Sequence, residues 1–352
     1  MNASRALLLP FAWLYSLVLK TRHALYDRSV LKSTRPSIPT IVIGNLALGG
    51  TGKTPHVELV IEILKEHRTI ATLSRGYGRN GTGFHEVQPG DVASLSGDEP
   101  LQLKRKFPTV RVFVGADRVR SIEMMQKQIK DLRVAILDDA FQHRRLNASL
   151  NILLTTWHRP YYKDALLPAG TLRDVTSRRK AAQLVIVTKC PSLPSIEEQI
   201  HWRKQLGLRT DQELFFSGIE YADPYSILDG KPVPIERSTA VLLVTGIADP
   251  VPLVEHLRAR ASTVEHIAFP DHHVFSRKDL DRLADRSAKF APGDQVLVTT
   301  EKDAERLKPL LAGSPIEKIK IAVIGIRAKI LNAPERFSAL IEEHVGKDQA
   351  DR

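Results

Sequence analysis

The residues best suited to chemistry form a glycine-rich loop, GNLALGGTGKT, at positions 44–54. Its glycines let the backbone turn tightly, so that several N–H groups converge on phosphate oxygens. The side chain of Lys53 can reach the β- and γ-phosphates of a nucleotide, and the Thr54 hydroxyl can bind Mg²⁺. Ala47 stands where the strict pattern has a glycine, but the GGTGKT end is intact. The loop predicts a nucleoside triphosphate site formed by Gly49, Gly50, Thr51, Gly52, Lys53 and Thr54.

A pair of aspartates, Asp138 and Asp139, follows the apolar run 134–137. In P-loop proteins a carboxylate at the end of a neighbouring strand holds Mg²⁺. Gln142 and His143 follow the pair within about one helical turn. We expect the two aspartates to serve the metal, although a solvated acid pair at the end of a strand has the same sequence.

Four shorter segments carry groups that suit phosphoryl transfer but are also ordinary loop sequences. Asp98 lies in a glycine- and proline-framed turn, and His272 follows an aspartate, which can make an imidazole an acid or a base. Arg173 and Asp174 end a loop that can clamp phosphate or metal. The four segments are SRGYGR (74–79), GDEP (97–100), LPAGTLRD (167–174) and PDHH (270–273).

These motifs are positioned by short apolar runs that alternate with helix-compatible stretches. Apolar residues at 57, 60, 61 and 64 have the spacing of an amphipathic helix directly after the glycine-rich loop. The alternation predicts a P-loop-type α/β fold, with a parallel sheet covered by helices on both faces. Ligands of such sheets bind beyond the carboxyl ends of the strands. The predicted strands are 40–43, 69–73, 110–114, 134–137, 152–154, 184–188, 241–245, 264–269, 295–299 and 319–326.

A polar stretch rich in proline and aspartate, at 223–238, interrupts this alternation. The strands and helices that follow it predict a second, smaller α/β lobe. We therefore expect three consecutive parts. They are an N-terminal hydrophobic and basic membrane-associated helix (1–30), a P-loop core domain (31–228) and a smaller C-terminal lobe that contributes to the active-site cleft (229–352).

Composition and the N-terminus bear on the partners of the protein. The 352 residues carry a formal charge of +11, which favours an anionic partner, and the single cysteine excludes an internal disulfide. Residues 6–19 form an uncharged apolar run with basic flanks. The run is shorter than the roughly 20 residues that a spanning helix needs. It is either a buried core helix or an interfacial anchor whose basic flank contacts acidic headgroups.

Taken in order, these segments resemble the tetraacyldisaccharide 4′-kinases, which phosphorylate the lipid A precursor. The P-loop alone is shared by many enzymes, but its combination with GDEP, DDxxQH and DHH is specific. The resemblance covers about residues 40–303. The matching segments are IGNLALGGTGKTP (43–55), SRGYGR (74–79), GDEP (97–100), DDAFQH (138–143), LPAGTLRD (167–174), GIADP (246–250), FPDHH (269–273) and TEKD (300–303).

The resemblance implies transfer of the γ-phosphate of ATP, with Mg²⁺, to the 4′-hydroxyl of an acylated glucosamine disaccharide 1-phosphate. It implies Asp98 as the candidate base, with His272 tuning or sharing that role. The other expected catalytic residues are Lys53, Asp138 and Asp139. The expected metal ligands are Thr54, Asp138, Asp139 and Asp174. The expected substrate contacts are Arg75, Gln142, His143, Arg173 and Asp271.

Two positions depart from the family pattern: Ala140 replaces the usual glycine, and Asp174 replaces the usual, longer glutamate. The resemblance further implies a peripheral or monotopic protein at the cytoplasmic face of the bacterial inner membrane, with an anionic acylated substrate and no obligate protein partner.

The main alternative is a membrane-bound P-loop ATPase switch of the partitioning or targeting type, which shares the GGxGKT loop. Such loops carry a second lysine before the glycine pair, where this chain has Ala47 and Leu48. A GTPase is not favoured either, because Thr188-Lys189-Cys190 is followed by Pro191 and not by the aspartate that reads guanine. Aromatic residues are only 6% of the chain and do not alternate with basic ones, so nucleic-acid binding is not expected.

Overall fold

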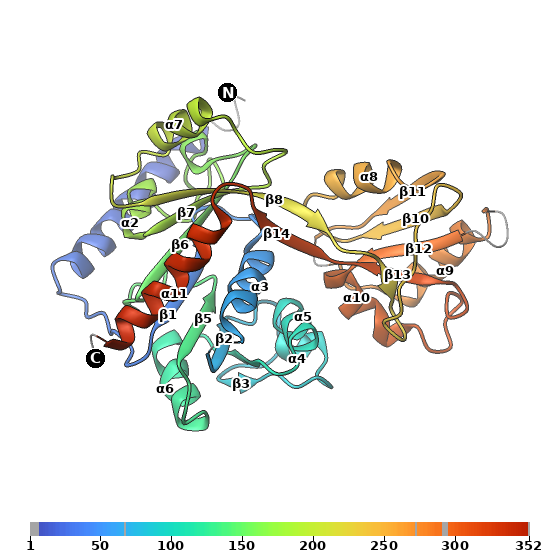
Figure 1. The fold of residues 1–352 in the computed structure, drawn as a ribbon, viewed down its shortest axis with the longest axis horizontal. Helices are drawn as coiled ribbons and strands as arrows, with labels where there is room; N and C mark the ends of the chain where they lie inside the picture. The colour runs from blue at the N-terminus through green and yellow to red at the C-terminus, as the bar shows by residue number, and fades with distance from the viewer. Residues whose placement is uncertain (1–6, 67, 272, 291–294, 351–352) are drawn as a thin grey trace. The chain divides into compact units, whose positions relative to one another are not determined.

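The structure is a computed structural model that describes residues 7–66, 68–271, 273–290 and 295–350. The chain folds into two compact units (Figure 1). The first comprises Met1–Pro89, Leu103–Ile219 and Ala328–Arg352, and the second comprises Gly90–Gln102 and Glu220–Arg327.

In the described residues, a nine-stranded sheet with the order β14-β8-β7-β6-β1-β5-β2-β4-β3 forms the first unit. The pairings from β8 to β4 are parallel, and the short β3 is antiparallel to β4. The strands are β1 (Thr40–Asn45), β2 (Ile70–Ser74), β3 (His85–Glu86), β4 (Arg111–Val114), β5 (Val134–Asp138), β6 (Leu150–Thr156), β7 (Leu184–Thr188), β8 (Glu213–Tyr221) and β14 (Ile326–Ile330).

Strand β1 lies between β5 and β6, and Ile43 is paired with Asp138 of β5. Every residue of β1 is buried, as expected for a strand that is covered on both faces. Because parallel strands end at the same edge of a sheet, the loop after β1 and the acid pair of β5 lie at one carboxyl edge.

Helix α3 (Lys53–Leu64) covers one face of this sheet. It contacts β1 and β5 and lies beside α11 (Pro334–Ala350) (Figure 1). The predicted apolar positions Val57, Val60, Ile61 and Leu64 are all at most 1% exposed, which confirms the amphipathic pattern. The other helical segments of the unit are α2 (Leu9–Asp27), α6 (Arg118–Gln128), α7 (Ile196–Gln205) and the 3₁₀ helices η1 (Tyr161–Lys163) and η2 (Thr176–Ala181).

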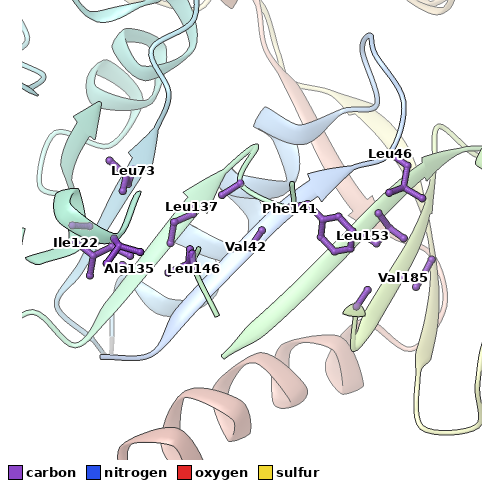
Figure 2. Packing of buried hydrophobic residues seen from close by; sticks show 14 of the residues in the cluster. Val42, Leu46, Leu73, Ile122, Ala135, Leu137, Phe141, Leu146, Leu153 and Val185 are labelled. Atoms are coloured by element: carbon purple, nitrogen blue, oxygen red, sulfur yellow. The ribbon is translucent and has the colours of Figure 1, made fainter. Parts of the chain in front are cut away.

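The opposite face of the sheet packs against α6 and α7. Val42, Leu73 and Ala135 project from β1, β2 and β5 into one apolar cluster with Ile122 of α6 (Figure 2). Trp202 of α7 belongs to the same cluster. Since neighbouring residues of a strand point to opposite faces, these contacts lie across the sheet from α3. The prediction of a parallel sheet with helices on both faces is therefore confirmed.

The division of the chain differs from the expected linear one. The last 25 residues return to the first unit through α11, whereas Gly90–Gln102 belong to the second unit. The predicted strand 319–326 is two strands, β13 (Ile321–Ile324) and β14, with Gly325 between them. In β14 the sequence IRAKI alternates charged and apolar residues and is only partly buried, so it lacks the continuous apolar run used to predict strands.

In the described residues, the second unit has a five-stranded sheet with the order β11-β10-β12-β13-β9. Alternate residues of its strands pack against α8 on one face and against α9 and α10 on the other. Its elements are β9 (Tyr225–Ser226), β10 (Ala240–Thr245), β11 (Thr263–Ala268), β12 (Gln295–Thr300), β13, α4 (Ala93–Ser96), α8 (Val251–Arg258), α9 (Arg277–Ser287), α10 (Glu301–Leu307) and η3 (Lys308–Leu310). Helix α5 (Asp98–Lys106) begins in this unit.

Residues 9–19 of the apolar N-terminal run lie in α2, which extends beyond the run to Asp27, and residue 6 of the run is outside the described residues. One side of α2 is buried through Ala12, Leu19 and His23, whereas Phe11 and Trp13 are 63% and 69% exposed. No helix in the described part of the chain combines the length and the apolar character needed to cross a bilayer.

Candidate active site

The glycine-rich loop leaves the carboxyl end of β1 and leads directly into α3. Gly49 and Gly52 have φ angles of 101° and 84°, which a side chain would strain, so these two positions require glycine. The Asn45 side chain donates a hydrogen bond to Thr51 Oγ1 (2.8 Å), and the Thr188 hydroxyl donates to the Thr51 carbonyl (2.9 Å). These bonds fix the middle of the loop from β1 and β7.

The N-terminus of α3 is open toward this loop. Its N-cap residue, Gly52, has no side chain with which to cap the first amides of the helix. Those N–H groups and the positive end of the helix dipole are therefore available to an anion. Lys53 and Thr54 are the first two residues of the helix. The arrangement fits the phosphates of a nucleotide, as the sequence predicts.

A cluster of charges lies beside the loop. Arg173 donates hydrogen bonds to both carboxylate oxygens of Asp139, one of them at 2.8 Å, and to Asn45 Oδ1 at 2.6 Å. The Lys53 Nζ atom is 4.0 Å from Asp139 Oδ1. Burial raises the pKa of Asp139, but the hydrogen bonds from Arg173 and the charge of Lys53 outweigh it and hold this pKa below its ordinary value. Asp139 is therefore ionised at neutral pH.

The turn after β5 explains how Ala140 is tolerated. Asp139 itself adopts the left-handed conformation, with φ of 53°, and Ala140 does not. An alanine at this position therefore causes no backbone strain. The strained conformation falls on the residue that contacts Lys53 and Arg173, as is common at functional sites.

The expected metal residues offer a suitable set of donors. Thr54 is the second residue of α3, Asp138 ends β5, and Asp139 directly follows it. Strand β5 is the neighbour of β1 in the sheet. A hydroxyl and two carboxylates are the hard oxygen ligands that Mg²⁺ takes in sites completed by phosphate and water. Gln142 donates a hydrogen bond to the carbonyl of Asn45 (2.7 Å), and so ties the segment after the acid pair to the end of β1.

Asp174 is only 1% exposed. Its Oδ1 atom lies 2.6 Å from Nε2 of His23, on α2. The Tyr15 hydroxyl, also on α2, donates to the carbonyl of Arg173 (3.0 Å). Asp174 thus joins the N-terminal helix to the loop that carries Arg173, and a metal contact through Asp174 stays a prediction.

Two polar residues of the first unit were not predicted as site residues from the sequence. Arg118 is 3% exposed, and burial lowers its pKa to about 10 against the opposing charge of Asp139. His56 bridges the Gly52 carbonyl (2.7 Å) and Ser217 Oγ (2.9 Å), and burial lowers its pKa to about 4. Neither belongs to a recognised motif, and the only signal for His56 was a polar residue on the buried face of α3.

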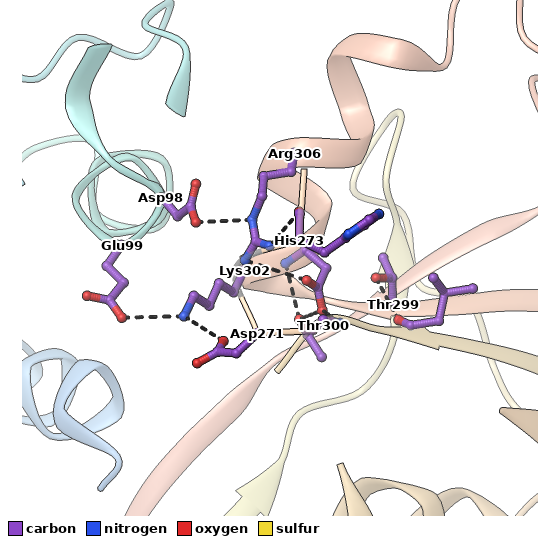
Figure 3. Close-up of polar contacts among 11 residues, drawn as sticks. Asp98, Glu99, Asp271, His273, Thr299, Thr300, Lys302 and Arg306 are labelled. Atoms are coloured by element: carbon purple, nitrogen blue, oxygen red, sulfur yellow. Dashed lines mark hydrogen bonds and ion pairs between the residues drawn. The ribbon is translucent and has the colours of Figure 1, made fainter. Parts of the chain in front are cut away.

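The expected residues of the second unit form a separate set of contacts (Figure 3). Asp98 is the first residue of α5, and its Oδ2 atom is 3.0 Å from Nε of Arg306. Asp271 lies 3.5 Å from the Lys302 ammonium group. His272 is outside the described residues, but its neighbour His273 accepts a hydrogen bond from Arg306 through its carbonyl (2.8 Å).

The remaining expected contacts, Arg75 and His143, lie in the first unit. Arg75 is exposed directly after β2, and its positive charge helps to lower the pKa of Arg118. His143 is partly buried; burial and the charge of Arg118 lower its pKa. Their roles in substrate binding stay predictions.

The known proteins to which this chain is similar share one activity in their names. The profile of the family LpxK, Tetraacyldisaccharide-1-P 4′-kinase, matches residues 4–346. The tetraacyldisaccharide 4′-kinase of Bacteroides thetaiotaomicron is 40% identical over an aligned length of 334, and the alignment covers 88% of this chain and 87% of that protein. The enzyme of the same name from Flavobacterium johnsoniae is 38% identical over 98% of both chains.

A solved structure is similar over nearly the whole chain. It is the "apo" form of LpxK from Aquifex aeolicus in complex with ATP. The TM-score is 0.74 and the identity is 28%, over 97% of this chain and 99% of that one. None of these similarities supports a partitioning-type ATPase switch.

Proposed function

The chain belongs to the tetraacyldisaccharide-1-phosphate 4′-kinase family, and from this membership and its phosphate-binding geometry we propose the roles of its residues in an ATP-dependent lipid kinase. The reaction is transfer of the γ-phosphate of ATP to the 4′-hydroxyl of a tetraacylated glucosamine disaccharide 1-phosphate, in lipid A biosynthesis. The observation that carries the proposal is the open N-terminus of α3, where Lys53 stands beside Asp139 and Arg173.

In this proposal the first unit binds the nucleotide. The backbone of Gly49–Gly52 and the first amides of α3 hold the phosphates, and Lys53 faces the transferred phosphoryl group. Thr54, Asp138 and Asp139 would hold Mg²⁺, which supplies charge neutralisation when bound. Arg173 keeps Asp139 ionised and fixed in direction through its two hydrogen bonds.

Asp98 is the proposed proton acceptor for the attacking sugar hydroxyl. Its carboxylate lies at the start of α5, after a glycine with φ of 90° that lets the chain turn into the helix. His272 follows Asp271 in the sequence and is proposed to share or tune this role. Proton acceptance by a positioned carboxylate is the contribution that a kinase adds to phosphate positioning.

The direct test is a phosphotransfer assay with the full chain. ATP, Mg²⁺ and an acylated disaccharide 1-phosphate are incubated with the enzyme in detergent, and the lipid is analysed by mass. We expect one added phosphoryl group per acceptor, dependent on ATP. Hydrolysis of ATP without a phosphorylated lipid would reject the proposal, and samples without acceptor measure that background.

We also propose that α2 lies in the interface of the cytoplasmic membrane leaflet, where an acylated substrate is embedded. Leu14, Leu17 and Val18 are 48–57% exposed on a helix whose other side is buried. Lys20, in the second half of this helix, and Arg28, directly after its end, are exposed and can meet acidic headgroups. An apolar face with basic residues nearby is the pattern of an interfacial helix.

Vesicle sedimentation tests this placement. Replacing Leu17 with aspartate is expected to weaken vesicle binding by about tenfold or more, because a leucine side chain contributes about 1.5–3 kcal/mol when it leaves water. Ile200→Asp is the matched control, since Ile200 is an exposed apolar residue of α7. Equal binding of the wild type to neutral and anionic vesicles would remove the electrostatic part, and normal binding of Leu17→Asp would remove the apolar part.

A further inference from the structure

The segment that carries Asp98 is attached to a helix about 200 residues further along the chain, within the second unit (Figure 3). Glu99 lies 3.7 Å from the Lys302 ammonium group, and Gln102 donates a hydrogen bond to Glu301 (3.0 Å). Asp98, Glu99 and Gln102 have the i, i+1, i+4 spacing of one helix face. The first turn of α5 is thus attached along α10 by polar and charged contacts.

Arg306 differs from the other residues of this attachment because its side chain is only 6% exposed. Its guanidinium group reaches three parts of the unit. Nε lies 3.0 Å from Asp98 Oδ2, Nη1 donates to the carbonyl of His273 (2.8 Å), and Nη2 lies 3.6 Å from Asp303 Oδ1. The group therefore connects the start of α5 to the loop that contains Asp271 and His273.

Arg306 is itself held in place by its ion pair with Asp303. Asp303 is fully buried and accepts hydrogen bonds from the Gly246 amide (2.9 Å) and the Thr300 hydroxyl (2.8 Å). Burial raises the pKa of Asp303, and these hydrogen bonds and the charge of Arg306 oppose that change. Gly246 directly follows β10, and Thr300 is the last residue of the adjacent strand β12. The guanidinium group is thus anchored to the sheet of the unit.

We propose that Arg306 is a positioning residue that holds the Asp98 carboxylate and the backbone of His273 in fixed relation for proton transfer. The inference rests on the proposed function, in which Asp98 accepts the proton. The planar guanidinium spreads its charge over three nitrogens, so Nε and Nη2 form ion pairs with Asp98 and Asp303 while Nη1 donates to the His273 carbonyl. A lysine ammonium is a compact charge on a flexible stem and cannot make these contacts together.

The test compares Arg306→Gln, Asp98→Asn and the double variant with the wild type. Arg306→Gln is expected to lower kcat by about 10- to 100-fold, since small displacements of a reacting group cost up to that much. The KM for ATP is expected to stay within about twofold, because the phosphate site is built by other residues. The double variant should be no slower than Asp98→Asn alone, because Arg306 acts through Asp98.

Arg306→Lys keeps the charge and serves if Arg306→Gln does not fold. It is expected to unfold at nearly the wild-type temperature but to lose about tenfold in kcat. Arg286→Gln is the matched control, because Arg286 forms a partly exposed ion pair with Glu265 in the same unit. That control is expected to keep its kcat.

Three outcomes would overturn the inference. The first is a normal kcat in folded Arg306→Gln or in Arg306→Lys. The second is a double variant whose loss is the product of the two single losses, which would mean that Arg306 supports the fold independently of Asp98. The third is normal turnover of Asp98→Asn. This result would reject Asp98 as the base, and the inference about Arg306 with it. Only this third outcome bears on the proposed function.

Discussion

Replacing Asp98 with asparagine is expected to lower kcat by about 10²- to 10⁴-fold, the usual contribution of a general base. The amide is close in shape to the carboxylate but does not accept a proton at neutral pH. Affinity for ATP is expected to stay within about twofold, because removal of a group that acts in the transition state spares ground-state binding. Steady-state kinetics with the lipid acceptor gives kcat, and calorimetric titration gives the ATP affinity.

The interpretation needs a control for charge removal in general. Asp281 is an exposed aspartate on α9 of the same unit, and Asp281→Asn should behave as the wild type. Turnover of Asp98→Asn within about threefold of the wild type, well below the range of general-base effects, would reject Asp98 as the proton acceptor. His272→Gln, measured in the same assay, then becomes the variant that reports the base.

The nucleotide half of the site could be predicted from sequence because its residues are close together in the chain. Glycines at 49 and 52, a lysine and a threonine within six positions define both the turn and the groups that it presents. The strands around them are continuous apolar runs, which are the easiest elements to predict. Their parallel pairing then brings Asp139 to the edge where Lys53 lies.

Residues that act across long sequence distances could not be predicted. Arg306 lies 208 positions from Asp98, and Asp174 lies 151 positions from its partner His23. Neither Arg306 nor His23 belongs to a motif, and an arginine three residues after an aspartate normally indicates only a solvated helix face. Their importance depends on burial, which follows from the packing of the whole unit and not from local spacing.

The predicted domain boundaries differ from the division in the structure for a related physical reason. The polar stretch at 223–238 correctly marks an interruption, but α11 packs beside α3, so the C-terminus completes the first unit. A prediction made from the order of the sequence assigns consecutive residues to the same lobe, and so misses a C-terminal segment that returns to the first unit. The reversal at Gly325 and the half-polar strand β14 carry no strong signal of a return to the first sheet.

The charges beside the P-loop explain how Lys53 can remain available to phosphate. Arg173 donates directly to both oxygens of Asp139, whereas Lys53 remains at 4.0 Å. Asp139 is therefore compensated mainly by Arg173. A charge pair at 4 Å interacts by only about 1 kcal/mol in water and about 4 kcal/mol near a protein surface. Lys53 can then turn toward a phosphate group without leaving Asp139 unpaired.

This arrangement predicts a severe effect for Lys53→Met, in which the side chain keeps its length and loses its charge. We expect kcat/KM for ATP to fall by about 10²- to 10³-fold, the cost of removing one preorganised group that stabilises developing charge. Lys53→Arg is expected to recover only part of this loss, because a planar guanidinium does not occupy the place of a compact ammonium. Steady-state kinetics over a range of ATP concentrations separates kcat from KM.

Lys65→Met is the matched control for the same helix. Lys65 caps the opposite end of α3 and pairs with Glu62 at the surface, where solvent screens the pair. Its loss should leave both kinetic constants unchanged, so any shared effect would report α3 and not the phosphate site. Normal kcat/KM in Lys53→Met would mean that the N-terminus of α3 does not hold the transferred phosphoryl group, because the cation nearest to that point would then be dispensable.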